Sequence, residues 1–119
     1  VTGDGGFLFT ATELATAVQY GISLVTIIFN NNKFGNVQRQ QKEWFGGRLI
    51  TSDLHNPDFV KFAESFGAAA YRTDNPEGLR QFIRKGLAHN GPTIIEVDIT
   101  EDMESPWKFI LTPPVRGQK

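Results

Sequence analysis

Residues 23–31 read Ser-Leu-Val-Thr-Ile-Ile-Phe-Asn-Asn, an almost continuously apolar and β-branched run that ends in two asparagines. Strands of a parallel sheet are covered by helices on both faces, so their sequences are apolar throughout rather than alternating. The run therefore predicts a strand over Ser23–Phe29 that is buried on both faces, with Asn30 and Asn31 at its carboxyl end.

A glycine turn, Gly-Asp-Gly at residues 3–5, precedes this strand near the start of the chain. The interval between the two motifs is long enough for one crossover helix and one return strand. Carboxyl ends of neighbouring parallel strands meet at one edge of a sheet. We therefore expect the Asp4 carboxylate and the Asn31 carboxamide to lie close together.

Three segments carry the start signals of helices. Thr10 and Glu13 have the spacing of a capping box, in which each side chain satisfies a free backbone donor of the other. Asn56 and Asn75 are each followed by proline, which is typical of a capping asparagine with proline at the first helical position. The predicted helix stops are Gly21, Gly67 and Asn90-Gly91.

The remaining elements complete an α/β pattern, which predicts an open parallel sheet flanked by helices. Only Val1 and Thr2 precede the glycine turn, so we expect the first strand to be incomplete and the chain to be a fragment. Glu96 and Asp98, in the last strand, are interpreted as its polar face or exposed end. The other predicted segments are a loop over Asn30–Ile50 with a helix over Val37–Trp44, strands over Ala69–Arg72 and Pro92–Ile99, and an irregular tail over residues 100–119.

Composition excludes several classes of protein. The chain has 119 residues, which allows at most one domain, and a net charge of −1 with no basic stripe argues against nucleic-acid binding. It has no cysteine, which excludes disulfides and thiolate-held metal sites. No apolar stretch approaches the roughly 20 residues of a membrane span, and no signal peptide is visible, so the expected location is cytoplasmic.

The two motifs carry chemistry that suits a metal-bound diphosphate. Asp4 and Asn31 offer hard oxygen ligands of the kind that Mg²⁺ prefers, while Gly3, Gly5 and Gly6 let the backbone approach phosphate oxygens. Either motif alone is more often an ordinary turn. A dinucleotide-binding Gly-x-Gly-x-x-Gly motif would need glycine at the position of Leu8, and no Gly-Lys-Ser/Thr phosphate loop is present.

This pair of motifs resembles the thiamine-diphosphate motif, in which Gly-Asp-Gly is followed some two dozen residues later by Asn-Asn. The chain is similar to the C-terminal, diphosphate-binding domain of thiamine-diphosphate-dependent 2-oxo acid decarboxylases and carboligases, acetolactate synthases above all. The resemblance runs from Gly3 to about Ile99. Further matching segments are Phe34-Gly35-Asn36-Val37, Arg39-Gln40-Gln41, Phe45, Arg48, Asn56-Pro57-Asp58-Phe59 and Ala63-Glu64-x-x-Gly67.

The resemblance implies roles for individual residues. It makes the side chains of Asp4 and Asn31 and the backbone carbonyl of Lys33 ligands of Mg²⁺. Acetolactate synthases carry Met and Trp where this chain has Asn36 and Gln40, so the resemblance concerns cofactor binding more than acetolactate synthase specificity. The implied cofactor-binding residues are Gly3, Asp4, Gly5, Gly6, Asn31, Lys33, Phe34 and Gly35, and the implied substrate-channel residues are Asn36, Val37 and Gln40.

The resemblance also implies partners. The glutamate that activates the cofactor is expected in a separate pyrimidine-binding domain, usually on a partner subunit of a homodimer or homotetramer, so no catalytic residue is expected in this chain. Trp44, Phe45 and Trp107 are candidates for packing against the missing domains. The implied enzyme is a lyase or transferase acting on a small 2-oxo acid, inactive as this chain alone. Two alternatives remain: a non-catalytic cofactor-binding or regulatory module, and an oxidoreductase with a flavin in another domain.

Overall fold

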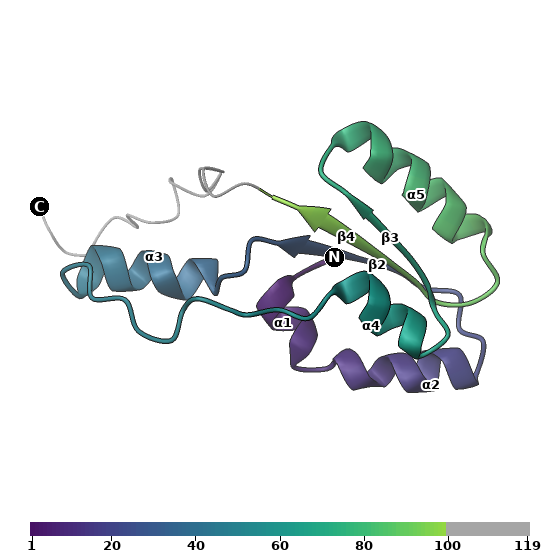
Figure 1. The fold of residues 1–119 in the computed structure, drawn as a ribbon, viewed down its shortest axis with the longest axis horizontal. Helices are drawn as coiled ribbons and strands as arrows, with labels where there is room; N and C mark the ends of the chain where they lie inside the picture. Colours follow the sequence, from purple (N-terminus) through teal and green to yellow (C-terminus); the bar gives the residue numbers. More distant parts are fainter. Residues whose placement is uncertain (100–119) are drawn as a thin grey trace, which may run out of the picture.

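The computed structural model describes residues 1–99, so the tail predicted over residues 100–119, with Trp107, lies outside the described residues. Four parallel strands form one sheet in the spatial order β1-β2-β4-β3 (Figure 1). The predicted α/β fold with an open parallel sheet flanked by helices is confirmed. The strands are β1 (Thr2–Gly3), β2 (Val25–Asn30), β3 (Ala69–Thr73) and β4 (Thr93–Asp98).

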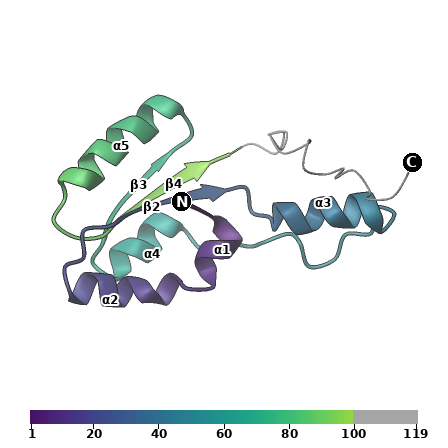
Figure 2. The same cartoon turned by 180° about the vertical axis from the view of Figure 1, so that it is seen from behind.

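Helices cover the sheet from both sides. Helix α5 lies on one face, and helices α2 and α4 lie on the other (Figures 1 and 2). Helix α3 lies beyond the carboxyl ends of the strands, away from the other helices (Figure 1). Among residues 1–99, no helix is both long and apolar enough to cross a membrane. The helices are α1 (Asp4–Leu8), the 3₁₀ turn η1 (Ala11–Glu13), α2 (Leu14–Gln19), α3 (Gly35–Trp44), α4 (Phe59–Ser65) and α5 (Pro76–Ala88).

The hydrophobic core lies between the sheet and helices α2 and α4. Ile28 of β2 and Phe59 of α4 are fully buried there, and Ile94 of β4 belongs to the same cluster. The Phe7 ring contacts the Phe59 ring edge to face, with 5.7 Å between the ring centroids. Because Phe7 belongs to α1, this aromatic contact holds the segment that begins with Asp4 against the core.

The strand predicted over residues 23–29 is present as β2, but the prediction that both of its faces are buried is wrong. Val25, Ile27 and Phe29 are only half-buried, whereas β4 is buried from Thr93 to Val97. The last turns of α5 contact the start of β2, where a Cβ added to Gly86 would lie 2.9 Å from the side chain of Val25. Beyond that contact, a hollow of about 450 Å³ is lined by Phe29. In the described chain, β4 is therefore the most buried strand.

The structure confirms the cap predicted for one helix start and contradicts the cap predicted for another. Asn75 caps α5 as predicted, because its Oδ1 accepts a hydrogen bond from the backbone N–H of Gly78 at 2.8 Å, and Pro76 opens the helix. Thr10 makes no side-chain cap, so the predicted capping box with Glu13 is wrong. The segment starts as a 3₁₀ turn, in which the backbone N–H of Glu13 donates to the carbonyl oxygen of Thr10 at 3.0 Å.

Helix α4 begins later than the sequence predicted. Its N-cap is Asp58, whose Oδ1 accepts hydrogen bonds from the backbone N–H groups of Val60 and Lys61, both at 3.1 Å. Asn56, the predicted cap, donates its hydrogen bonds to side chains at the end of the sheet. The helix therefore starts two residues further along the chain, at Phe59.

Replacing the α5 cap tests this local account. Asn75→Ala removes the acceptor of the Gly78 N–H and should destabilise the start of the helix by about 1 kcal/mol. Hydrogen exchange measured by mass spectrometry should show roughly fivefold faster exchange in the first turn of α5. Exchange in β4 should stay unchanged, and equal acceleration in both elements would contradict a local capping role.

Candidate functional site

The two sequence motifs meet at the carboxyl end of the sheet. Strand β1 pairs in parallel with β2, and Gly3 lies opposite Phe29. Asp4 therefore follows β1 at the level where Asn30 ends β2. Helix α1 begins at Asp4 with Gly3 as its N-cap, although the sequence predicted only a turn there. The carboxyl ends of β1 and β2, which carry the two motifs, are thus neighbours in the fold.

A hollow of about 180 Å³ lies between the glycine motif and residues 33–37, which follow the asparagine motif. All predicted cofactor-binding residues except Asn31 line it, as do two of the three predicted channel residues. Gln40, the third, is not part of this lining. Asn31 lies beside it, because its Nδ2 would be 3.6 Å from a Cβ added to Gly35. The lining residues are Gly3, Asp4, Gly5, Gly6, Lys33, Phe34, Gly35, Asn36 and Val37.

Asp4 is a buried acidic residue in the lining of this hollow. Asp4 is only 2% exposed, and its Oδ2 accepts a hydrogen bond from Nδ2 of Asn56 at 2.7 Å. Burying a carboxylate is costly unless its charge is compensated. The Asn56 amide brings no positive charge, and Lys33 is a further charged residue in the lining of the same hollow. An oxygen of a buried carboxylate at this place is a candidate ligand for a cation.

Aromatic packing holds Phe34, three residues after the asparagine motif, against the glycine motif. A Cβ added to Gly5 would clash with the Phe34 ring, so only glycine allows this close approach. The Phe34 ring also stacks on Phe9, with 6.1 Å between the ring centroids. By contrast, a Cβ added to Gly3 would meet nothing within 4 Å. Gly3 therefore leaves open space at the hollow, whereas Gly5 serves the packing of Phe34.

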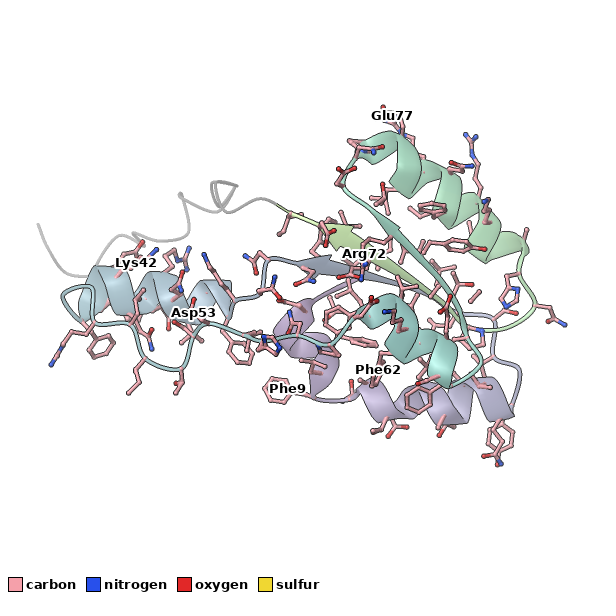
Figure 3. All side chains as sticks on the ribbon, viewed as in Figure 1. Phe9, Lys42, Asp53, Phe62, Arg72 and Glu77 are labelled. Atoms are coloured by element: carbon pink, nitrogen blue, oxygen red, sulfur yellow. The ribbon has the colours of Figure 1, made fainter. Side chains whose placement is uncertain are left out.

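Polar side chains connect the site to the far strands of the sheet. Asn56 Nδ2 also donates to Asn30 Oδ1 at 2.9 Å, and Asn30 Nδ2 donates to Glu96 Oε1 at 2.7 Å. Arg72 Nε donates to the other oxygen of Glu96 at 2.8 Å. Arg72 lies between the sheet and α4, where it also pairs with Asp58 at 2.8 Å (Figure 3). We call these five residues, with Asp4, the strand-end network.

Glu96 corrects one interpretation of the sequence. It is 2% exposed, so it does not form the exposed polar face of β4, whereas Asp98 at the end of the strand is exposed. Arg72 lies opposite Glu96 in the β3–β4 register, and its hydrogen bond to Glu96 raises the pKa of Arg72. The backbone N–H of Lys61 lowers the pKa of Asp58, and Arg72 acts in the same direction. The charges of Arg72 and Asp58 therefore persist at neutral pH.

The donors around Asp4 suit a hard cation rather than a soft one. Within residues 1–99 there is no group of three or more His, Cys, Asp and Glu side chains that could hold a metal ion. Asp4 instead shares the lining of the hollow with Lys33, and Asn31 lies beside Gly35 of the same lining. Carboxylate, carboxamide and backbone oxygens are ligands typical of Mg²⁺ shared with phosphate. In addition, Asn56 Oδ1 is buried and has no hydrogen-bond partner among the described residues, so an acceptor at the site remains to be satisfied.

The roles of Asn30, Asn56 and Glu96 in this network were not predicted from the sequence. One signal was available: Glu96 is a lone charged residue in the apolar run from Thr93 to Val97, and a charged residue that is fully buried is almost always paired. The position of Asn56 could not be found this way, because its partner Asp4 is 52 positions away in the chain.

Comparisons with known sequences agree with this geometry. The family described as thiamine pyrophosphate enzyme, C-terminal TPP binding domain, matches residues 1–97. The acetolactate synthase of Bacillus subtilis (strain 168) is 42% identical over 99 residues, which are 83% of this chain and 17% of that protein. A 3D-(3,5/4)-trihydroxycyclohexane-1,2-dione hydrolase of Shouchella clausii is 32% identical over 118 residues, 90% of this chain and 18% of that protein. The chain thus spans less than a fifth of these relatives.

A solved structure shows the same fold at similar coverage. The thiamine diphosphate-dependent 4-hydroxybenzoylformate decarboxylase of Rhodococcus jostii RHA1 superposes with a TM-score of 0.79 and 32% sequence identity. The superposition covers 86% of this chain and 19% of that protein. The fold described for residues 1–99 is therefore found inside a much larger thiamine diphosphate-dependent enzyme.

The contact between Gly5 and Phe34 can be tested with a matched pair of substitutions. Gly5→Ala forces the Phe34 ring to move and should lower the free energy of unfolding by about 1–3 kcal/mol. Gly3→Ala, whose Cβ enters open space, should have a smaller effect. Urea unfolding followed by the loss of circular dichroism measures both variants, and equal losses would contradict the packing role of Gly5.

Proposed function

This chain belongs to the family of C-terminal TPP-binding domains of thiamine pyrophosphate enzymes, and we propose that it binds the diphosphate of thiamine diphosphate through Mg²⁺. The observation that carries this proposal is the buried Asp4 carboxylate, which accepts a hydrogen bond from the Asn56 amide and belongs to the lining of the hollow beside the glycine motif. A divalent cation compensates both this carboxylate and the diphosphate.

The residues of the two motifs divide the work of binding. Asp4, Asn31 and the backbone carbonyl of Lys33 would hold Mg²⁺. The open space at Gly3 supports a close approach of phosphate oxygens to the backbone there. The remaining proposed cofactor-binding residues, all of them in the hollow, are Gly5, Gly6, Phe34 and Gly35.

We propose that the chain works as part of an acetolactate synthase-like enzyme that decarboxylates 2-oxo acids or joins them to a second carbonyl compound. The support is its similarity to acetolactate synthases and to a 4-hydroxybenzoylformate decarboxylase. The bound cofactor supplies the electron sink for this chemistry. Asn36 and Val37 are exposed at the start of α3 and line the hollow. Their position supports the proposal that they lie beside the substrate, together with Gln40 one turn further along α3.

Further protein is expected around this chain in the enzyme. Large apolar side chains are exposed along α3 and after it, and such exposure marks interaction surfaces. Trp44 is 66% exposed and Phe45 is 54% exposed. We propose that a pyrimidine-binding domain covers this region, contributed by the partner subunit of a homodimer or homotetramer, and that it brings the activating glutamate. This chain alone would then be inactive.

Replacing Asp4 tests the metal site. In the full-length protein, Asp4→Ala should weaken thiamine diphosphate binding by more than about 100-fold, since loss of outer partners of a metal ligand alone costs 10–100-fold. Calorimetric titration of thiamine diphosphate, with Mg²⁺ and then with excess chelator, measures the effect. Wild-type binding should need Mg²⁺, and the residual binding of the variant should not respond to it.

Asp74→Ala is the matched control, because it removes an exposed carboxylate that does not line the hollow. It should bind thiamine diphosphate as the wild type does. Wild-type affinity in Asp4→Ala, or wild-type binding that survives the chelator, would overturn the proposed metal site.

A further inference from the structure

Asn56 connects the two motifs through a single amide group. It lies in the segment between α3 and α4, and its Nδ2 donates to Asp4 Oδ2 at 2.7 Å and to Asn30 Oδ1 at 2.9 Å. Asp4 begins α1 and Asn30 ends β2. Both protons of the amide are therefore used, each on a different motif.

The rest of the strand-end network fixes which way this amide points. Asn30 Nδ2 donates to Glu96 Oε1 at 2.7 Å, so Asn30 must turn its oxygen toward Asn56. Asn56 must then present its NH₂ group, because a reversed amide would place its oxygen against the oxygens of Asp4 and Asn30. Glu96 is held in turn, since its other carboxylate oxygen is paired with Arg72 at 2.7 Å.

The backbone around Asn56 is anchored as well. Two residues on, Asp58 caps α4 and pairs with Arg72 at 2.8 Å, so the same arginine holds Glu96 and the segment that carries Asn56. Pro57 lies between them and restricts the backbone conformation of its own residue and of the preceding one. The orientation of the Asn56 amide is thus fixed by Asn30 of β2, which Glu96 of β4 orients in turn, and by the anchored main chain around Asn56.

We propose that Asn56 is a positioning residue for the Asp4 carboxylate. Its hydrogen bond holds one oxygen of Asp4 and so fixes the direction of the other toward the cation, with Asn30 and Glu96 keeping the amide in that orientation. The inference rests on the proposed function of Asp4 as a Mg²⁺ ligand and names the group that prepares it. Partners of metal-ligating carboxylates tune metal affinity in this way.

The test is a Mg²⁺ titration of the full-length protein at saturating thiamine diphosphate, with calorimetry as the readout. Asn56→Ala should raise the half-saturating Mg²⁺ concentration by roughly 10–100-fold. Binding of thiamine diphosphate should recover when Mg²⁺ is in large excess, because the metal ligands themselves remain. Asn56→Ser, which keeps one donor but is too short to reach both acceptors, should behave in the same way and serves if the alanine variant does not fold.

Asn75→Ala is the matched control. It removes another asparagine, one whose side chain accepts a hydrogen bond at the start of α5 and which lies outside the strand-end network. Its half-saturating Mg²⁺ concentration should equal that of the wild type. An unchanged Mg²⁺ requirement in both folded Asn56 variants overturns the positioning role while the proposed function stands. Binding lost at every Mg²⁺ concentration, or loss of circular dichroism in both variants, also overturns it, in favour of a direct cofactor contact or a structural role. A wild type that never binds thiamine diphosphate overturns both proposals.

Discussion

The hydrogen bond between the Asn56 amide and the buried Asp4 carboxylate organises the functional end of this fold. Taking a carboxylate out of water costs several kcal/mol unless other groups compensate it. The hydrogen bond from the uncharged Asn56 amide compensates part of that cost. The carboxylate lies at the edge of the sheet where the glycine motif and the asparagine motif converge.

Around this contact, the sheet and its helices act as a frame. The strand-end network crosses from α1 to β2, then to β4 and β3, and returns to α4 through Arg72 and Asp58. The buried charge of Glu96 is paired with Arg72, so removing Arg72 would break this pair and leave the Glu96 carboxylate buried without it. Below the network, apolar packing of Phe59 against Phe7 holds α4 and α1 in place. Polar and apolar contacts thus position Asp4 together.

Local sequence was sufficient for the elements whose causes are local. The apolar runs of β2 and β4 predicted parallel strands, and the Asn75-Pro76 pair predicted the start of α5. The Asn56-Pro57-Asp58 segment holds two residues that can cap a helix, and local sequence does not choose between them. The choice depends on Asp4 and Asn30, which are distant in the chain, so only the folded structure shows that Asp58 is the cap.

The partners of Glu96 could not be predicted for the same reason, because they lie on neighbouring strands whose register is not evident from the sequence. In the candidate site, the approach of the two motifs was predictable from strand order, whereas the side chains that orient Asp4 were not.

The most direct measurement is a structure of the full-length protein with thiamine diphosphate and Mn²⁺ in place of Mg²⁺, read by anomalous scattering. We expect a Mn²⁺ peak bound by Asp4 and Asn31, with the hydrogen bond between Asn56 and Asp4 preserved; bound cofactor with no metal at Asp4 would overturn the proposed metal site.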